Sequence, residues 1–375
     1  MNNGKYKNHT KSRLGILCGV ACIVILVSTL WPFHPFPSNH VEWIPEANGI
    51  QLGIPGVVLS RKPLNAATGA SKQPCSLELL VRPVDTFFVY AIMGFYESRS
   101  ARQLLVRQWT DGLLVRHQIP TSGGRVETPK FEVLHAFSRG KLRLVTITSS
   151  PSGTIVYLDG VRAKTFPDFV VSLEELSGEI VLGTSAVDYD PWPGEIRGLA
   201  IYSKELTSAE AFHHYQSWIE GEKTGPPDLN GAIARYAFTE RAGRVIHSAV
   251  SGGADLEIPK RFVIPHKVLL QYPWKEYEPN WNYVNDLLRN ISGFIPLGIV
   301  LCAYLSLTQY YRNLVLFATL LGGTLSFVIE VLQAYIPQRS SGMTDIVTNT
   351  LGALLGALLW KSRVVNAILA RRGFR

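Results

Sequence analysis

The chain has 375 residues, of which 46% are hydrophobic and 18% are charged, so it is too apolar for a disordered protein and too long for one ordinary domain. A formal net charge of +8 would indicate a nucleic-acid partner only if the positive charge were spread over the folded body. Instead, nine of the 37 Lys and Arg residues lie in two terminal segments without acids, residues 1–13 and 361–375. The remaining 28 Lys and Arg residues lie between these segments together with all 29 acidic residues, so their charges nearly cancel. This excludes a broadly basic nucleic-acid-binding body.

The two basic tails flank apolar sequence, as the positive-inside rule describes, and both termini are therefore predicted to be cytoplasmic. Residues 14–31 carry no charge and would form a helix of about 27 Å, close to the ~30 Å of a bilayer core. We expect a first transmembrane helix over residues 14–33. The alternative is a cleaved or lipidated leader around Cys22, but no Ala-x-Ala-like site follows the apolar run.

Three more apolar runs, residues 291–307, 314–336 and 346–360, bring the number of predicted spans to four. The last run is short and is expected to extend back to Met343. An even number of spans returns the C-terminus to the cytoplasm, which predicts a multi-pass protein of the cytoplasmic membrane with residues 34–285 mainly outside. Aromatic residues typical of the two membrane interfaces support this topology: Trp274, Tyr277, Trp281 and Tyr283 outside, and Tyr310, Tyr311 and Arg312 inside.

Residues 41 to about 280 have the composition of β structure. Short runs rich in branched residues, such as residues 142–148, alternate with Gly, Pro, Ser and Asp. The Asp159-Gly160 pair predicts a two-residue hairpin turn, because both residues tolerate positive φ. One helix is predicted over residues 208–220, with Thr207 or Ser208 as its N-cap.

Several short motifs follow one another in this region: residues 76–78, 145–147, 157–160, 178–183 and 192–206. Their order resembles a laminin-G or concanavalin A-like domain, a two-sheet jelly roll, over roughly residues 41–218. The resemblance implies an all-β sandwich over residues 41–225. Residues 226–282 are expected to add strands and a membrane-proximal linker, which either complete the sandwich or connect it to the membrane.

Folds of this type often bind glycans, and the loop from Asp188 to Trp192 places carboxylates beside aromatic rings. Asp188 and Asp190 are candidate ligands for Ca²⁺, while Tyr189 and Trp192 are candidate platforms for a sugar ring. No other cofactor is predicted. The structural alternative, in which Trp192 packs into the core, is favoured because Pro-Trp in a β-sandwich usually serves packing.

Other residues with chemical potential in this region give weaker signals. Glu78 and Glu179 lie on predicted strands, but nothing in the sequence makes them converge as a glycosidase pair must. His213 and His214 are expected at the surface of the helix, because adjacent helical residues point in different directions. Cys75 is the one cysteine outside the predicted spans, so no intrachain disulfide is expected.

Ionisable residues in the last three spans need an explanation, because an unpaired charge at membrane depth costs about 2.5–3.5 kcal/mol. They recur at helical spacing, so each helix carries one polar stripe, and by the predicted topology all three stripes lie toward the outer leaflet. Glu330 is expected to pair with Arg289 or with Arg339 of the connecting loop. The stripes predict one polar pocket with these members: Asp286, Arg289, Asn290, Glu330, Gln333, Arg339, Asp345 and Asn349.

Small residues predict close packing of the same helices, with Gly352 and Gly356 forming a small-xxx-small seam. The polar positions, together with residues 294–298, Ser326, Pro337 and Gly352, resemble the VanZ-like membrane family. The resemblance implies a three-helix VanZ-like domain over residues 283–360. It also implies a role in the cell envelope, since the family prototype is associated with low-level teicoplanin resistance, but it implies no particular reaction.

Two functions from different classes follow. In the first, the protein is not an enzyme: the sandwich binds a surface polysaccharide or envelope protein, and the polar pocket binds the headgroup of a membrane lipid. In the second, the pocket acts on a lipid-linked envelope intermediate, with Arg289 and Arg339 clamping a phosphate and Glu330 or Asp345 acting as a base or cation ligand. A purely structural ion-pair network is the remaining explanation of the pocket. The oligomeric state is not predicted.

Overall fold

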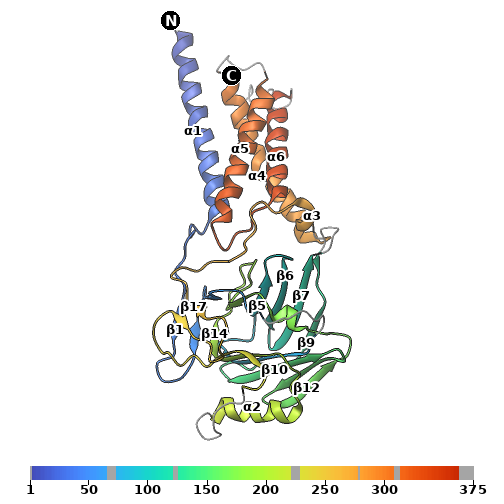
Figure 1. Ribbon diagram of the computed structural model, residues 1–375. Coiled ribbons are helices and arrows are strands. Elements are labelled where there is room, and N and C mark those ends of the chain that lie inside the picture. Colours follow the sequence, from blue (N-terminus) through green and yellow to red (C-terminus); the bar gives the residue numbers. More distant parts are fainter. Residues whose placement is uncertain are drawn as a thin grey trace. The chain divides into compact units, whose positions relative to one another are not determined.

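The computed structural model describes residues 2–65, 73–120, 126–220, 229–277, 279–307 and 313–362. The chain forms two compact units, one made of Met1–Pro35 and Val268–Arg375 and the other of Phe36–Lys267. The first unit is helical and the second is built mainly of strands (Figure 1), which confirms the predicted fold class. The predicted inner-face anchor, Tyr310 to Arg312, and residues 363–375 of the C-terminal basic tail lie outside the described residues.

The second unit is a sandwich of two antiparallel sheets. The first sheet has the neighbour order β1 (Val41–Trp43), β2 (Ile50–Leu52), β14 (Gly194–Tyr202), β4 (Cys75–Pro83), β10 (Arg143–Ser150), β11 (Gly153–Leu158) and β12 (Val161–Phe166), and β15 (Ala232–Tyr236) also pairs with β14. The second sheet has the order β16 (Val245–Ile246), β17 (Leu256–Glu257), β3 (Val58–Ser60), β13 (Glu179–Leu182), β5 (Val89–Glu97), β6 (Arg102–Trp109), β7 (Gly112–Pro120) and β8 (Val126–Glu127), and β9 (Lys130–Val133) pairs with β7. Connections cross between the sheets, as in a jelly roll.

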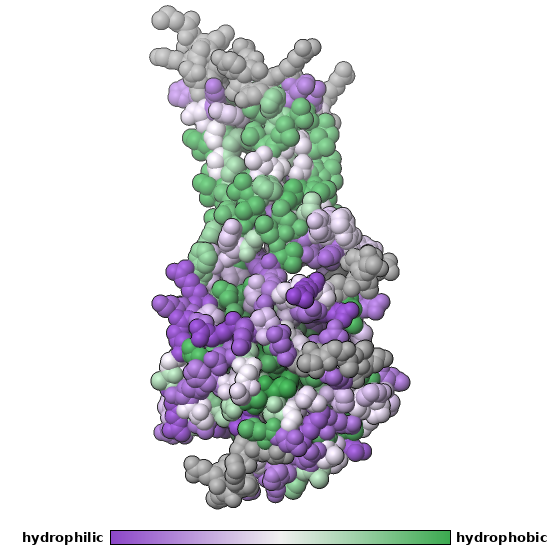
Figure 2. Space-filling view, viewed as in Figure 1, coloured by the Kyte–Doolittle hydropathy of each residue, from purple (hydrophilic) through white to green (hydrophobic). Residues whose placement is uncertain are grey.

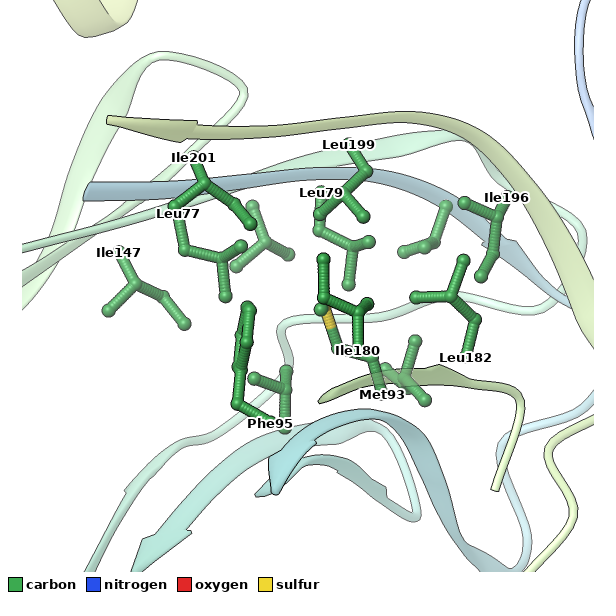
Figure 3. Packing of buried hydrophobic residues seen from close by; sticks show 14 of the residues in the cluster. Leu77, Leu79, Met93, Phe95, Ile147, Ile180, Leu182, Ile196, Leu199 and Ile201 are labelled. Carbon is green, nitrogen blue, oxygen red and sulfur yellow. The ribbon is translucent and has the colours of Figure 1, made fainter. Parts of the chain in front are cut away.

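The core lies between the two sheets and follows the period-two alternation of the strands. Leu77 and Leu199 of the first sheet face Phe95 and Leu182 of the second (Figure 3), and all four are at most 2% exposed. The Asp159-Gly160 turn joins β11 to β12, with both residues at positive φ as predicted. A short 3-10 helix, η1 (Leu173–Leu176), precedes β13.

The last three strands of the unit belong to the sandwich. β15 pairs with β14 in the first sheet, β17 pairs with β3 in the second, and β16 pairs with β17. Of the two alternatives that the sequence leaves open for this region, the structure therefore has the one in which these strands complete the sandwich.

The two ends of the sandwich unit lie side by side. The backbone N–H of Phe262 donates to the carbonyl of Pro37 at 3.0 Å, and Ser38 forms an isolated antiparallel bridge with Arg261. The chain therefore enters and leaves this unit at neighbouring points.

Helix α2 (Ser208–Glu220) packs on the first sheet, in contact with β10 and β12 (Figure 1). Its N-terminus is held by a capping box, in which Glu210 N–H donates to Thr207 Oγ1 at 3.3 Å and Thr207 N–H donates to Glu210 Oε2 at 2.8 Å. Lys204 Nζ donates to Glu210 Oε1 at 2.7 Å. The hydrogen bond from Lys204, followed by that from the Thr207 backbone, lowers the pKa of Glu210 from 4.5 to about 2.

Acid should weaken the start of α2. Because the folded pKa of Glu210 lies below its ordinary 4.5, the stabilisation is fully present above pH 4.5 and is lost as the pH falls toward about 2. Solvent screens this partly exposed group, so we expect a loss of about 1 kcal/mol. The Glu210→Gln variant should lack this dependence. Thermal unfolding followed between about pH 5 and pH 2.5 tests it, and parallel curves for the two proteins would refute it.

The first unit contains α1 (Asn2–Leu30), the short α3 (Pro273–Glu276), α4 (Trp281–Ser306), α5 (Leu314–Ala334) and α6 (Met343–Lys361). All but α3 are long and apolar enough to cross a membrane, and hydrophobic residues predominate along these helices in Figure 2. α4 begins at Trp281 rather than at residue 291, because Asn280 caps it by accepting the N–H of Tyr283 at 2.8 Å. α6 begins at Met343, as predicted.

Candidate functional site

Two carboxylates hold the N-terminus of α6. Glu330 of α5 is 1% exposed, and its Oε2 accepts the backbone N–H of Gly342, the N-cap residue of α6, at 2.7 Å. Oε2 of Glu276, at the end of α3, accepts the N–H of Thr344 at 3.1 Å. A Cβ on Gly342 would overlap the carboxylate of Glu276, so glycine permits this approach. Free N–H groups and the helix dipole make this end of α6 a favourable place for negative charge.

Two asparagines tie α6 to its neighbours at the same end. Asn290 of α4 donates from Nδ2 to Asp345 Oδ1 at 2.7 Å, and Asn349 donates from Nδ2 to Ser326 Oγ of α5 at 2.9 Å. Asn349 is only 4% exposed, yet its Oδ1 has no hydrogen-bond partner among the described residues. We refer to the following residues as the helix-end cluster: Glu276, Asn290, Ser326, Glu330, Asp345 and Asn349.

The helix-end cluster holds three carboxyl groups without a cationic partner among the described residues. Within the part of the chain that the structure describes, Glu276, Glu330 and Asp345 form no ion pair with Lys, Arg or His within 4.0 Å. The hydrogen-bond partners of these carboxylates among the described residues are two backbone N–H groups and one asparagine side chain. Glu330 is buried, and a buried carboxylate without a cation carries a desolvation cost that a positively charged group would offset.

Neither predicted ion pair of Glu330 is formed. Arg289 points away from α6, with its side chain 79% exposed, and pairs with Asp286 at 3.2 Å. Arg339 donates from Nε to the backbone carbonyl of Trp31 at 3.1 Å. Successive residues of a helix are about 100° apart around its axis. α4 is turned so that Asn290, the residue after Arg289, faces α6, and Arg289 itself does not.

The structure thus divides the predicted polar pocket. Asn290, Glu330, Asp345 and Asn349 come together, whereas Asp286 and Arg289 lie on the exposed face of α4. Gln333 donates from Nε2 to the carbonyl of Thr29 at 3.0 Å and so joins α5 to α1. Glu276 was not predicted as a member, since its only local signal is a Pro at the start of a one-turn helix.

The aromatic residues of the sandwich loop are used for packing. Trp192 is fully buried, and its Nε1–H donates to Gln108 Oε1 at 2.7 Å. The ring of Tyr189 packs edge-on against Phe262, with ring centroids 5.7 Å apart. Trp192 therefore packs in the core, as the favoured structural alternative states, and Tyr189 is partly covered by Phe262.

The two aspartates of that loop face arginines. Asp190 pairs with Arg107 at 2.5 Å. Burial raises the pKa of both Asp188 and Asp190, while the positive charges of Arg107 and Arg116 act against this rise. Ca²⁺ takes six to eight oxygen ligands, and no group of three or more His, Cys, Asp or Glu residues that could hold a metal is found among the described residues. Arg107 occupies Asp190 in this structure, and a Ca²⁺ site at Asp188 and Asp190 stays a prediction.

A buried hydrogen-bond network centred on Glu78 lies beneath α2 and includes His214, which was predicted to be at the surface. Glu78 is fully buried and lies 2.9 Å from His214 Nδ1, and it accepts hydrogen bonds from Tyr202 Oη at 3.1 Å and Trp218 Nε1 at 3.0 Å. The expectation of surface exposure was wrong for His214, which points toward the sheet. Glu179 lies in the other sheet, 2.7 Å from His266 Nε2, so it does not converge with Glu78.

Residues 246–366 match the VanZ/LLP1 family model, and residues 72–211 match that of the concanavalin A-like lectin/glucanases superfamily. The chain joins a VanZ-like domain to a concanavalin A-like domain. Both predicted resemblances are confirmed, and the VanZ match begins at residue 246, earlier than the predicted residue 283. No curated protein matches the chain.

Solved structures similar to the chain include a proposed carbohydrate binding protein from Bacteroides ovatus, with 14% identity and a TM-score of 0.38 over 58% of this chain. The receptor binding domain of botulinum neurotoxin D has 19% identity and a TM-score of 0.35 over 48% of this chain. A heptameric SAP-like pentraxin from Limulus polyphemus has 12% identity and a TM-score of 0.34, covering 60% of this chain and 93% of the pentraxin. The chain spans 61% of the first protein and 46% of the second.

In the VanZ-like domain, the helix-end cluster offers carboxylate oxygens and, in Asn349, an amide oxygen that has no partner in the described part of the chain. These groups are hydrogen-bond acceptors, so the arrangement suits a ligand that donates hydrogen bonds and carries positive charge. It does not present cationic side chains toward a phosphate, because Arg289 and Arg339 are directed elsewhere.

Proposed function

We propose that the protein is a multi-pass membrane protein of the cell envelope. Its VanZ-like domain binds the headgroup of a membrane lipid at the helix-end cluster, and its concanavalin A-like domain binds a surface glycan or an envelope protein. Both termini are cytoplasmic and residues 34–285 are mainly extracytoplasmic. The observation that carries the proposal is the gathering of three carboxyl groups, Glu276, Glu330 and Asp345, at one end of apolar helices without a cationic partner among the described residues.

Aromatic residues next to the cluster support a position at headgroup depth. Trp274 and Tyr277, on either side of Glu276 in the chain, are exposed, as is Trp281 at the start of α4. Exposed Trp and Tyr residues favour the membrane–water interface, where the ring contacts hydrocarbon and the polar edge contacts water. The carboxylates of the helix-end cluster would then lie beside the headgroups rather than at the bilayer centre.

The charge of the cluster selects among headgroups. An ammonium group, as in phosphatidylethanolamine, would supply the positive charge that the carboxylates lack and would donate hydrogen bonds to them. An anionic headgroup such as phosphatidylglycerol would be repelled by the same carboxylates. We therefore expect the VanZ-like domain to prefer an amine-bearing lipid.

The test is lipid retention by the full chain in nanodiscs of equal phosphatidylethanolamine and phosphatidylglycerol, measured by native mass spectrometry after transfer to detergent. Wild type should retain phosphatidylethanolamine, and the double variant Glu330→Gln, Asp345→Asn should lose this preference by about tenfold, since two charges are removed. Both substitutions keep an oxygen that accepts the existing hydrogen bond. The matched control is Asp286→Asn, which neutralises a carboxylate outside the cluster and should leave the preference unchanged.

Two results would contradict the headgroup proposal. One is equal retention of both lipids by wild type, and the other is a double variant that keeps the full preference of wild type. If the double variant instead fails to accumulate as folded protein while Asp286→Asn folds normally, the cluster is a structural network.

The enzyme alternative, with Glu330 or Asp345 as base and the two arginines as phosphate clamp, has no specific contact in its favour, because neither arginine reaches these carboxylates. A link to teicoplanin susceptibility follows from the family resemblance and stays a prediction. Comparing the teicoplanin sensitivity of cells with and without the gene would test it.

A further inference from the structure

Exposed apolar side chains gather on three neighbouring loops of the concanavalin A-like domain. Phe87 and Phe88, between β4 and β5, are 70% and 61% exposed. Trp109 ends β6 before the turn into β7, and Leu134 follows β9. We refer to the following exposed residues as the aromatic loop surface: Val84, Phe87, Phe88, Trp109 and Leu134.

The first two loops are braced against each other. Thr110 N–H donates to the carbonyl of Phe88 at 3.1 Å, and the buried Gln108 donates from Nε2 to the carbonyl of Asp85 at 2.7 Å. Within the β4–β5 loop, Phe87 N–H donates to Asp85 Oδ1 at 3.1 Å. The two phenylalanines are therefore displayed from a backbone that is already fixed.

The third loop is joined to the other two. Phe137 N–H donates to the carbonyl of Asp111 at 2.8 Å, and Arg139 Nε donates to the carbonyl of Val84 at 3.2 Å. His135 Nδ1 lies 2.5 Å from Asp111 Oδ2. A ligand that binds here meets three loops ordered in advance, so little entropy is lost by the loops on binding.

Core packing does not explain these exposed rings. Exposed apolar residues on loops that are joined to one another are a candidate interaction site, because covering them removes apolar area from water. The Phe88 ring makes an edge contact with Tyr90 at 6.1 Å between centroids, while its exposed part faces solvent. The aromatic loop surface is therefore a candidate binding surface for another molecule.

Charged side chains near the exposed rings indicate what kind of molecule binds this surface. Asp85 and Asp111 lie on the first two loops and Arg139 follows the third, where it donates to the carbonyl of Val84, and Lys130 Nζ lies 5.9 Å from the centroid of the Trp109 ring. Inserting such a mixed set of charges into a bilayer would desolvate the carboxylates at high cost. Sugar hydroxyls both donate and accept hydrogen bonds, so they suit both signs of charge, and the C–H face of a sugar ring stacks on an aromatic ring.

We propose that the aromatic loop surface is a glycan-binding site, with Phe87 and Phe88 as platforms for sugar rings and Asp85, Asp111 and Arg139 as partners for their hydroxyls. This inference rests on the proposed glycan binding of the concanavalin A-like domain and gives that binding a place. The proposed glycan site therefore differs from the one predicted from the sequence, the loop of Asp188 and Trp192.

The test uses the full chain in detergent on an immobilised array of glucose-, galactose-, mannose- and N-acetylglucosamine-based oligosaccharides. Wild type should bind at least one class, and Phe87→Ala, Phe88→Ala should weaken that binding at least about tenfold, since two ring contacts are removed. The control is Phe212→Ala, which removes an exposed aromatic ring from α2 and should leave binding unchanged. Because all three rings are exposed, each variant should keep the thermal unfolding temperature of wild type.

The outcomes separate this inference from the proposed function. Oligosaccharide binding that persists in the double variant would overturn the site and leave glycan binding standing. Failure of wild type to bind any oligosaccharide would remove the glycan function and the site together. Self-association of wild type that the double variant abolishes, without sugar binding, would assign the surface to a second copy of the chain and also overturn the inference.

Discussion

Replacing Gly356 with leucine should force α4 away from α6 and destabilise the VanZ-like domain by more than about 3 kcal/mol. A Cβ on Gly356 would overlap the backbone carbonyl of Ile295, and a Cβ on Gly352 would overlap that of Ile291. A backbone in a helix cannot move aside as a flexible side chain can, so the helices must separate. The fraction of monodisperse protein remaining in detergent after heating measures the effect.

The matched control is Gly293→Leu. Gly293 lies on α4 as well, but a Cβ there meets nothing within 4 Å, so this substitution should change stability little. If Gly356→Leu and Gly293→Leu lose monodispersity at the same temperature, the close approach of α4 and α6 does not stabilise the domain.

Removing the carboxylate of Glu78 should be the most damaging single change in the sandwich. In Glu78→Ala, the donors on His214, Tyr202 and Trp218 lose their shared acceptor inside the protein. Unsatisfied buried polar groups cost about 1–3 kcal/mol each, so we expect a loss of about 4 kcal/mol. For a domain of this size that corresponds to a fall of roughly 10 °C in the unfolding temperature, measured by circular dichroism.

Glu174→Ala serves as the control for this change. Glu174 lies on η1, and its exposed carboxylate is 3.8 Å from Arg102, a surface pair expected to contribute less than about 1 kcal/mol. An unfolding temperature for Glu78→Ala within about 2 °C of wild type would show that the buried network does not hold α2 on the sheet.

Local patterns in the sequence predicted much of the fold. The four apolar helices follow from uninterrupted hydrophobic runs, and the turn between β11 and β12 follows from Asp159 and Gly160. Helix α2 begins where a hydroxyl residue is followed by a glutamate at capping-box spacing. Each of these signals is contained within a few residues or one turn of helix, so no knowledge of distant neighbours is needed.

The candidate site was predicted only in part, because spacing along a helix does not fix its rotation toward its neighbours. Asp286, Arg289 and Asn290 share one side of α4, yet only Asn290 faces α6. The prediction that Glu330 pairs with an arginine overlooked the N–H groups at the start of α6, which have no partner within the helix. One of them, the N–H of Gly342, donates a hydrogen bond to Glu330 Oε2.

Burial of polar residues in the sandwich was equally hard to predict. Nothing near Glu78 in the sequence indicates that His214, far along the chain, will be placed beside it by α2. The same is true of β15 and β17, whose partners lie in β14 and β3. Such contacts depend on the order of strands across both sheets, which single-strand patterns do not specify.

The neighbouring entry and exit of the sandwich unit bear on how this protein arose. Because Pro37 and Phe262 lie within a backbone hydrogen bond of each other, the whole unit between them behaves as a cassette in the connection after α1. A cassette with adjoining ends can be acquired or discarded during evolution by replacing it with a short linker, and the helices on either side keep their order. Ancestors without the sandwich would therefore have needed no rearrangement of the membrane helices to gain it.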